Sequence, residues 1–312
     1  MMTPAHAIEV RELSRHFGDT VAVDRVTFDV APGELFGIVG PDGAGKTTTL
    51  RMLSGVLPPT SGDAVVEGVS IARDPEGVKP HIAYMAQRFG LYEDLTVREN
   101  IEFYADLYRV SRGQRQERLP RLWRFSRLEP FQGRLAGQLS GGMKQKLSLC
   151  CSLIHHPGVL LLDEPTFGVD PISRRDLWLI LHEMVAEGVT VVVSTSYLDE
   201  AERCDRVALL DHGRILALDA PIALQRAFTA PLFSIRTDQP RRARDVLRTL
   251  SAVRSASLFG EAVHVVLAQE TDLQHLTATL QQAGLQVMDA QPIGASLEDV
   301  FIDRITRTEQ AA

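Results

Sequence analysis

The sequence predicts an α/β fold, and two observations support this class. Short apolar runs, at Leu35–Val39, Val159–Leu162 and Val189–Ser194, have the length of buried strands. Segments with the spacing of helices follow two of these runs, at Thr47–Leu53 and Arg174–Glu187. Apolar strands that alternate with helices are typical of a mostly parallel sheet that is covered on both faces.

The first part of the chain adds two regions to this core. Ala7–Leu13 and Val21–Val30 alternate apolar and polar residues, which predicts an antiparallel β subdomain of half-buried strands. The polar stretch Val97–Gln138 carries helical spacing, so we expect a helical subdomain over about residues 97–138. Together with a strand expected at Arg206–Leu210, these segments define a first domain over residues 1–228.

The character of the sequence changes after Phe228. The elements that follow have the order β-α-β-β-α-β, which is that of a ferredoxin-like unit. We therefore expect a small α+β accessory domain over residues 229–312. Its strands are expected at Leu232–Arg236, Val253–Leu258, Val263–Leu267 and Leu285–Ala290, and its helices at Arg241–Leu250, Thr271–Ala283 and Ser296–Thr308.

Composition and charge exclude several classes of protein. The 312 residues are 45% hydrophobic and 23% charged, which is ordinary for a folded globular chain. The net charge of −7 argues against a nucleic-acid partner, because such proteins usually carry a basic surface. The longest apolar runs are far shorter than the roughly 20 residues that span a bilayer, and the first residues lack the pattern of a secretion signal. We expect a cytosolic protein unless a partner holds it at a membrane.

A glycine-rich segment between the first core strand and the next helix fits the phosphate-binding pattern G-x-x-x-x-G-K-[ST]. Its glycines let the backbone curl so that several N–H groups point at one anion, and the following helix adds its positive N-terminal end. We expect Lys46 to reach the β- and γ-phosphates of ATP, and the Thr47 hydroxyl to bind Mg²⁺. The residues expected to hold the phosphates are Gly40, Pro41, Asp42, Gly43, Ala44, Gly45, Lys46, Thr47 and Thr48.

Two acids, Asp163 and Glu164, end the apolar run Val159–Leu162. A carboxylate at the end of a buried strand, beside a phosphate loop, holds Mg²⁺ in many nucleotide-hydrolysing enzymes. We therefore expect Asp163 to serve the metal and Glu164 to polarise the attacking water. Alone, such a pair would more often be the solvated end of a strand, but the phosphate loop upstream favours the catalytic interpretation.

Leu139-Ser140-Gly141-Gly142 opens a segment that starts polar and turns apolar, which predicts a second helix N-terminus able to accept an anion. A chain with one phosphate loop has no intramolecular need for a second phosphate cradle. Two copies that face each other head to tail do have that need.

In their order and approximate spacing, the phosphate loop, Leu-Ser-Gly-Gly and Leu-Leu-Leu-Asp-Glu-Pro-Thr resemble the motifs of ATP-binding cassette (ABC) ATPases, across roughly residues 8–215. The resemblance implies a cassette of the P-loop NTPase class that binds ATP and Mg²⁺. It also implies that Ser140, Gly141 and Gly142 face the γ-phosphate held by a partner cassette, and that Asp170 lies in the D-loop at the dimer interface.

Other positions match this family more loosely. Gln87 matches the glutamine that senses Mg²⁺ and the γ-phosphate, and Gly90–Thr96 matches the groove that receives a coupling helix of a membrane subunit. Phe17 matches the aromatic residue that stacks on adenine, although a core phenylalanine is nearly as good an interpretation.

One departure from the family pattern concerns catalysis. Ser196, in Ser194-Thr195-Ser196-Tyr197, stands where the family usually has a switch histidine. A serine donates one hydrogen bond but cannot carry a positive charge, so we expect slower hydrolysis with ATP binding retained. Asp42 stands where asparagine is more usual and adds a negative charge near the phosphates.

The C-terminal domain and its ending Ser296–Ile302 resemble the extension of daunorubicin-resistance-type drug exporters, and the Ser196 variant is similar to one half of tandem-ATPase exporters of Gram-negative bacteria. The resemblance implies a second cassette, identical or different, and transmembrane permease subunits that hold the chain at the cytoplasmic side of the cell membrane. Two alternatives stay open. One is a regulatory subunit that binds ATP with negligible hydrolysis, and the other is a soluble ABC ATPase that acts on ribosomes or DNA.

Overall fold

The structure, a computed structural model, describes residues 6–87, 90–268 and 273–311. The chain divides into two compact units, Met1–Leu218 and Asp219–Ala312, which we call the N-terminal unit and the C-terminal unit. Helix α8 (Pro221–Arg226) belongs to the C-terminal unit, so the observed division lies before this helix, whereas the sequence-based boundary at residue 228 lies after it.

A six-stranded sheet forms the centre of the N-terminal unit, with the strand order β10-β9-β3-β8-β7-β6. The five strands from β9 to β6 run parallel, as the apolar runs predict. The register pairs Val39 with Thr195 and Asp163 with Ser194, so β3, β7 and β8 end side by side. The strands span Leu35–Val39 (β3), Ile82–Met85 (β6), Val159–Asp163 (β7), Thr190–Thr195 (β8), Arg206–Asp211 (β9) and Arg214–Asp219 (β10).

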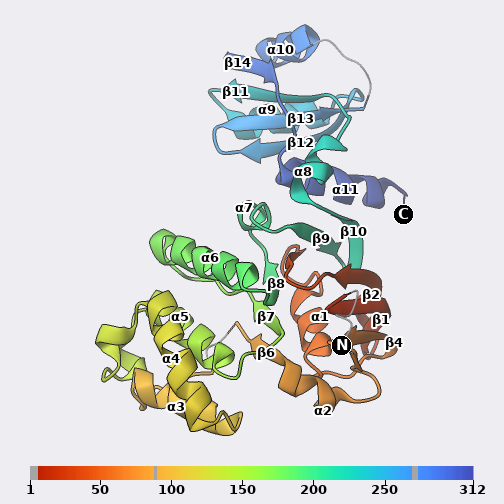
Figure 1. The fold of residues 1–312 in the computed structure, drawn as a ribbon. Coiled ribbons are helices and arrows are strands. Elements are labelled where there is room, and N and C mark those ends of the chain that lie inside the picture. The colour runs from red at the N-terminus through yellow and green to blue at the C-terminus, as the bar shows by residue number, and fades with distance from the viewer. Residues whose placement is uncertain (1–5, 88–89, 269–272, 312) are drawn as a thin grey trace. The chain divides into compact units, whose positions relative to one another are not determined.

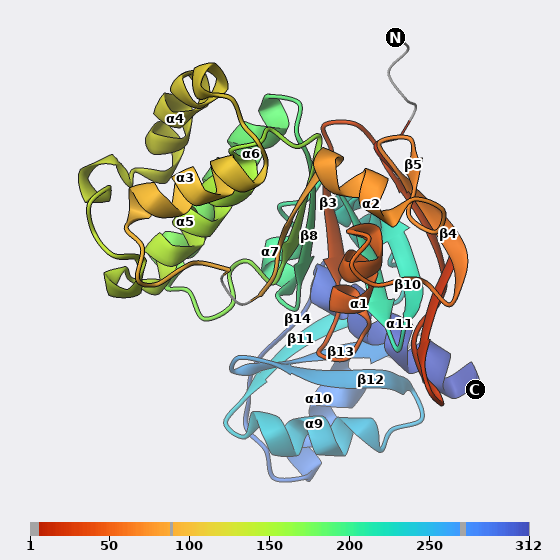
Figure 2. The same cartoon turned by 90° about the horizontal axis from the view of Figure 1, so that it is seen from below.

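A second sheet in the same unit is antiparallel, with the strand order β2-β1-β4-β5. Helix α1 (Lys46–Leu53) lies between the two sheets (Figure 2). Side chains of both sheets and of α1 form one core, in which the rings of Phe28 and Phe36 stack 5.3 Å apart. Packing on both sides holds α1, and with it the loop that precedes it, against the strand ends. The strands span Ile8–Phe17 (β1), Thr20–Val30 (β2), Ser61–Val66 (β4) and Val69–Ser70 (β5).

Helices α3 (Val97–Leu107), α4 (Arg112–Ser126) and α5 (Gly141–Leu153) form a helical subdomain beside the six-stranded sheet (Figure 1). Capping boxes start α3 and α4, because a hydroxyl before each helix and a Glu or Gln in its first turn satisfy each other's backbone N–H groups. The apolar core of this subdomain includes Leu147 and Ile154. It therefore extends beyond the limit expected at residue 138.

Shorter elements and one long helix complete the N-terminal unit. Helix α6 follows β7 after a loop, and the one-turn helix α7 follows β8 directly, so both begin near the strand ends. These elements are α2 (Pro75–Val78), α6 (Pro171–Ala186) and α7 (Leu198–Ala201), with 3₁₀ turns at Lys79–His81, Glu129–Phe131 and Ala136–Gln138.

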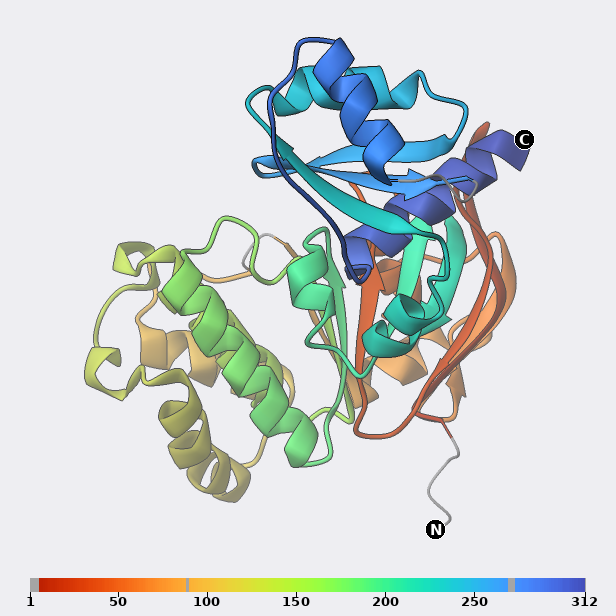
Figure 3. The ribbon, with the colours of Figure 1, turned by 90° about the horizontal axis from the view of Figure 1, so that it is seen from above.

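The C-terminal unit has the expected order of elements, β11-α9-β12-β13-α10-β14, and its antiparallel sheet has the strand order β12-β13-β11-β14. This is the ferredoxin-like arrangement, in which two β-α-β crossovers interleave. Figure 3 shows α9 and α10 above this sheet and α11 below it. The elements span Leu232–Thr237 (β11), Pro240–Arg248 (α9), Val253–Phe259 (β12), Ala262–Leu267 (β13), Leu273–Gln282 (α10), Val287–Pro292 (β14) and Leu297–Ala311 (α11).

Two further observations bear on the sequence-based expectations, one on the C-terminal unit and one on both units. The start expected for the second helix, at Thr271, lies outside the described residues, which resume at Leu273. Across the described part of both units, no helix combines the length and the apolar character that crossing a bilayer requires.

Candidate active site

The loop between β3 and α1 borders a cavity of about 290 Å³. Gly45 has a φ of +103°, which side chains rarely adopt, and a Cβ there would lie 2.5 Å from the carbonyl oxygen of Ala22. Residues Lys46–Thr48 line the cavity too, so α1 presents its positive N-terminal end to it. The lining residues are Ala22, Asp42, Gly43, Ala44, Gly45, Lys46, Thr47, Thr48, Gln87 and Glu164.

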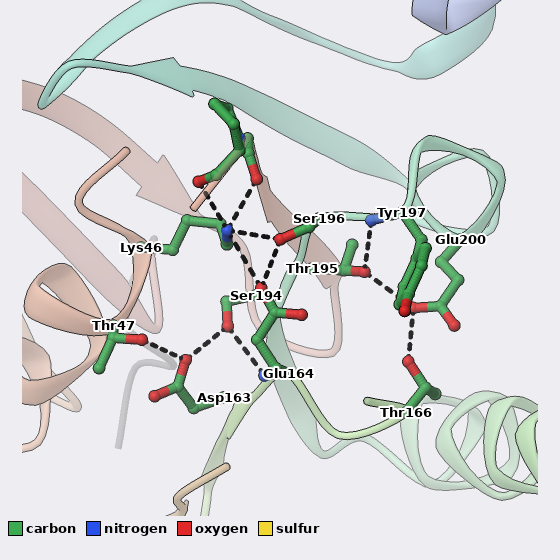
Figure 4. Close-up of polar contacts among 12 residues, drawn as sticks. Lys46, Thr47, Asp163, Glu164, Thr166, Ser194, Thr195, Ser196, Tyr197 and Glu200 are labelled. Carbon is green, nitrogen blue, oxygen red and sulfur yellow. Dashed lines mark hydrogen bonds and ion pairs between the residues drawn. The ribbon is translucent and has the colours of Figure 1, made fainter. Parts of the chain in front are cut away.

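The Lys46 side chain is 5% exposed, and its ammonium group has four partners (Figure 4). Nζ donates to the carbonyl oxygens of Gly40, at 2.7 Å, and Pro41, at 3.0 Å. It also donates to Ser196 Oγ at 2.8 Å and forms an ion pair with Glu164 Oε1 at 3.0 Å. A buried ammonium group is costly without such partners, so these contacts fix the charge at the phosphate loop.

Glu164 follows β7 in a strained conformation, with a φ of +50°. Its backbone N–H donates to Ser194 Oγ at 3.0 Å and to the carbonyl oxygen of Ser194 at 3.2 Å. Its carboxylate accepts a hydrogen bond from Ser196 Oγ at 2.8 Å. The strained turn therefore directs the carboxylate toward Ser196 and Lys46, and hydrogen bonds to Ser194 on the neighbouring strand hold it there.

Asp163 is 1% exposed and accepts three hydrogen bonds. Its Oδ1 accepts from Thr47 Oγ1 at 2.9 Å and from Ser194 Oγ at 2.8 Å, and its Oδ2 accepts from the Tyr84 hydroxyl at 3.2 Å. Burial, and secondarily the Asp163 charge, raise the pKa of Tyr84 to about 12, so the phenol keeps its proton and remains a donor. The carboxylate and the Thr47 hydroxyl thus lie together at the end of β7.

Two other predicted site residues occupy different environments. Gln87 is exposed and lines the phosphate-loop cavity, although it follows β6 and is far from the loop in sequence. Phe17 ends β1, is 48% exposed and lies outside the set of residues that line the cavity. The Arg15 guanidinium lies 4.6 Å from the centroid of its ring.

Ser140, Gly141 and Gly142 stand at the start of α5 and lie outside the set of residues that line the cavity. Ser140 is the N-cap, and its Oγ accepts from the Met143 N–H at 3.3 Å. Asp170 caps α6, where it accepts from the N–H groups of Ile172 and Ser173, and these bonds, that of Ser173 first, lower its pKa. A Cβ on Gly142 would lie 2.3 Å from Ser173 Oγ, so the starts of α5 and α6 approach closely.

The sequence reasoning missed several residues that organise this site. Ser194 links Asp163 to Glu164, Tyr84 binds Asp163, and the buried Glu200 binds the hydroxyls of Thr166 and Thr195. The one signal in the sequence is the polar run from Ser194 to Ser196 at the end of an otherwise apolar strand. The partners are too distant along the chain for spacing alone to reveal them.

Comparison with known proteins agrees with this geometry. A sequence model of the family described as ABC transporter matches residues 23–167. The chain is 43% identical over 290 residues to the probable multidrug ABC transporter ATP-binding protein YbhF of Escherichia coli K12. That alignment covers 91% of this chain but 49% of YbhF, so the chain spans about half the length of this relative.

Two further likenesses cover nearly the full length of the other protein. The daunorubicin resistance ATP-binding protein DrrA2 of Streptomyces coeruleorubidus is 34% identical over 312 residues, which covers 97% of each chain. The solved dimeric structure of the ATP-binding cassette MJ0796, in a post-hydrolysis state bound to ADP and Pi, superimposes with a TM-score of 0.62 at 25% identity, covering 68% of this chain and 98% of that one.

The chain belongs to the ATP-binding proteins of ABC transporters. The predicted resemblance to ABC ATPases is confirmed, and a daunorubicin-resistance protein is among the relatives. The predicted fold class is confirmed as well, since the N-terminal unit has the cassette fold and the C-terminal unit is ferredoxin-like.

Proposed function

We propose that this chain binds Mg²⁺-ATP in the cavity at the phosphate loop and hydrolyses it to drive separate membrane subunits of an exporter. The observation that carries this proposal is the meeting of Lys46, Glu164 and Ser196 in one hydrogen-bonded group beside that cavity. A phosphate-binding cation, a carboxylate that can polarise water and a neutral donor are the parts that γ-phosphate hydrolysis requires.

ATP binding rests on the backbone of Gly40–Thr48 and on Lys46. The glycine-rich loop and the start of α1 supply N–H groups for the β- and γ-phosphates, and the Lys46 ammonium adds a positive charge. Stacking of adenine on Phe17 is part of the proposal, because an exposed aromatic ring at the end of β1 suits that contact.

The Thr47 hydroxyl and the Asp163 carboxylate fit a magnesium ion. Both are hard oxygen donors, they lie 2.9 Å apart at the end of a buried strand, and Gln87 lines the same cavity. Mg²⁺ bound there supplies charge neutralisation of the phosphates. Hydrogen bonds from Ser194 and Tyr84 orient Asp163, which leaves its carboxylate little freedom.

Glu164 and Ser196 would carry the hydrolytic step. Glu164 lines the cavity, which places its carboxylate where it can accept a proton from the attacking water, and its ion pair with Lys46 holds it beside the phosphate loop. Ser196 donates to Glu164 and so orients it, but a serine cannot add the positive charge that a histidine offers at this position. We therefore expect a low rate of turnover by this chain.

The partner proteins of this chain are inferred from exposed motif residues that do not line its own cavity. Ser140 and Gly141 are exposed at the N-terminus of α5, and Asp170 is exposed at the start of α6, which suits a second cassette that places its ATP against them. The solved cassette MJ0796 is described as dimeric. Permease subunits would engage the groove at Gly90–Thr96 and hold the chain on the cytoplasmic side of the membrane.

Export as the direction of transport rests on the names of relatives. One of them is a probable multidrug protein and another a daunorubicin resistance protein, which favours a drug exporter. YbhF is about twice as long as this chain, so a second cassette in the working transporter is part of the proposal, whether it is identical to this one or different.

A regulatory subunit that binds ATP with negligible hydrolysis is the second candidate, and Ser196 is the observation that favours it. Steady-state ATP turnover of the purified chain separates the two, with Glu164→Gln as the baseline. If the chain hydrolyses ATP, its wild-type turnover rate should be about 10²–10³-fold higher than that of Glu164→Gln. Removal of one essential polar group from an active site lowers the rate by about this factor. Equal rates, with ATP still bound by both proteins, would establish the regulatory role instead.

A further inference from the structure

A second buried polar network, centred on Glu200, involves residues that adjoin the proposed hydrolytic residues in sequence. The Glu200 side chain is 1% exposed, although the residue belongs to the one-turn helix α7. Burying a carboxylate is costly unless charged and hydrogen-bonding partners surround it. The identity of these partners therefore shows what the carboxylate holds in place.

The partners of Glu200 come from three segments that the sequence separates. Its Oε2 accepts from Thr195 Oγ1 at 2.9 Å and from Thr166 Oγ1 at 2.8 Å (Figure 4). Its Oε1 forms an ion pair with Arg174 Nε at 3.2 Å. The Thr195 hydroxyl also accepts the Tyr197 N–H at 3.0 Å, and the Arg174 guanidinium lies 4.4 Å from the centroid of the Tyr197 ring.

Each partner adjoins a residue of the proposed site. Thr195 precedes Ser196, and Thr166 follows Glu164 by two positions. Arg174 lies in the first turn of α6, where its N–H donates to the carbonyl oxygen of the capping residue Asp170. One carboxylate thus connects the loop that carries Ser196, the loop that carries Glu164 and the helix start that carries Asp170.

We propose that Glu200 and Arg174 form a positioning pair that fixes Glu164 and Ser196 relative to each other and to the Asp170 loop. The inference rests on the proposed hydrolysis and deepens it. Neither member of the pair contacts Lys46 or lines the phosphate-loop cavity, so the pair acts on the rate of the chemical step through other residues and leaves ATP affinity largely unchanged.

Glu200→Gln is the first variant, because its side chain has nearly the same shape and no charge. An amide NH₂ group turned toward Arg174 faces a group that cannot accept a hydrogen bond. An amide turned the other way forces the two threonine hydroxyls, which donate to Glu200 in wild type, to accept instead. We expect kcat to fall about 10- to 100-fold, because small displacements of catalytic groups slow the chemical step by factors of this size. The KM and Kd for ATP should stay within about threefold of their wild-type values.

Matched variants separate positioning from general damage. Asp199→Asn, on the exposed neighbouring residue of α7, should leave kcat unchanged. Arg174→Met should behave like Glu200→Gln, and Arg174→Lys, which keeps the charge, should recover part of the rate. In a Ser196→Ala background, Glu200→Gln should reduce kcat by a smaller factor than in wild type. The part of its effect that depends on positioning Ser196 is absent there. If Glu200→Gln does not fold, Thr166→Val removes one of the hydrogen bonds and keeps the test available.

Hydrogen exchange supplies a readout that does not depend on turnover. In Glu200→Gln, amides in both 163–174 and 193–204 should exchange faster than in wild type, although only the second segment carries the substitution. Unchanged exchange in 163–174 would overturn the proposal, and so would faster exchange with wild-type kcat. A wild-type chain without turnover would instead refute the proposed hydrolysis, and exchange alone would then show whether the pair joins the two loops.

Discussion

Both units of this protein bury carboxylates, and the two sets differ in what surrounds them. In the N-terminal unit, Asp163, Glu164 and Glu200 lie where parallel strands end, and their partners come from several loops. In the C-terminal unit, Asp299 and Asp303 lie on the single helix α11. The first arrangement joins several loops next to a cavity that Glu164 lines, whereas the second attaches a helix to a sheet.

The C-terminal carboxylates satisfy their hydrogen-bonding capacity within the fold. Asp299 accepts from His264 Nδ1 at 2.8 Å and from the N–H and Oγ of Ser296 at the start of α11. Asp303 pairs with Arg254 at 3.0 Å and with Arg307 at 2.8 Å. A serine, a histidine and an aspartate thus meet without forming a catalytic group, since Ser296 and His264 both bind the carboxylate and not each other.

The difference shows how a functional site can be distinguished from a structural network. The Lys46 group borders a cavity of about 290 Å³, and a phosphate could take over several of its contacts. The cavity nearest to Asp303, between α8 and α11, measures about 50 Å³ and leaves little room for a ligand. Buried charge marks a site when its partners can be exchanged for a ligand, and otherwise it contributes to stability.

The largest effect that tests this comparison concerns ATP affinity. Lys46→Ala removes the only ammonium group that lines the described part of the cavity, and it leaves Glu164 buried without its cation. We expect the Kd for ATP to rise about 10²-fold or more, since a charged hydrogen bond is worth about 1.5–3 kcal/mol and the unpaired carboxylate adds repulsion. Calorimetric titration measures this change, and an unaltered Kd would show that Lys46 is structural.

A second variant tests the structural network. Asp299→Asn should reduce the stability of the C-terminal unit by about 1–3 kcal/mol without changing ATP affinity. Both tryptophans, Trp123 and Trp178, belong to the N-terminal unit, so their fluorescence follows that unit, while far-UV circular dichroism follows the whole chain. Destabilisation seen by dichroism but not by fluorescence would agree with separate roles, whereas a large loss of ATP binding would contradict them.

The pH dependence of the same unit follows from Asp299. Burial alone would raise its pKa, but the hydrogen bonds from His264 and Ser296 together outweigh burial and lower it below 3.8. A lowered pKa in the folded state gives stability that is present above the unfolded value and lost as pH falls through the folded one. Wild type should therefore lose stability below about pH 4, and Asp299→Asn should lose less over that range. If the stability of wild type and that of Asp299→Asn fall in parallel with pH, Asp299 does not contribute to this loss of stability in acid.

The smallest expected effect concerns the start of α11. Ser296 and Asp299 satisfy each other's backbone N–H groups as in a capping box, so Ser296→Ala should cost about 1 kcal/mol. In a unit of this size that corresponds to a fall in melting temperature of about 4–8 °C. A thermal scan followed by circular dichroism measures it, and no shift would mean that the helix end needs no cap.

Much of this architecture was predictable because local patterns specify it. The uniformly apolar runs became β3, β7 and β8, and the glycine-rich loop was placed correctly between a strand and a helix. The ferredoxin-like order was also correct, since each of its elements carries its own periodicity. Limits between domains were harder to predict, because the core of the helical subdomain recruits α5, which the sequence assigns to the signature motif.

The inner contacts of the site could not be predicted in the same way. Ser194 binds Asp163 only because the register of β7 and β8 brings these strand ends together, and register is a property of the whole sheet. No sequence pattern singles out Glu200, which stands in a polar stretch, whereas the fold buries it against Thr166 and Arg174. The roles assigned to Gln87, Asp170 and Phe17 remain predictions.

The measurement that most directly tests the account is the ATP turnover of Ser196→His, compared with wild type and with Glu164→Gln. If Ser196 orients Glu164 but lacks the charge that speeds hydrolysis, the histidine variant should turn over ATP about tenfold faster or more, and Glu164→Gln should remain at baseline. A wild-type rate above that baseline that Ser196→His leaves unchanged would contradict the account.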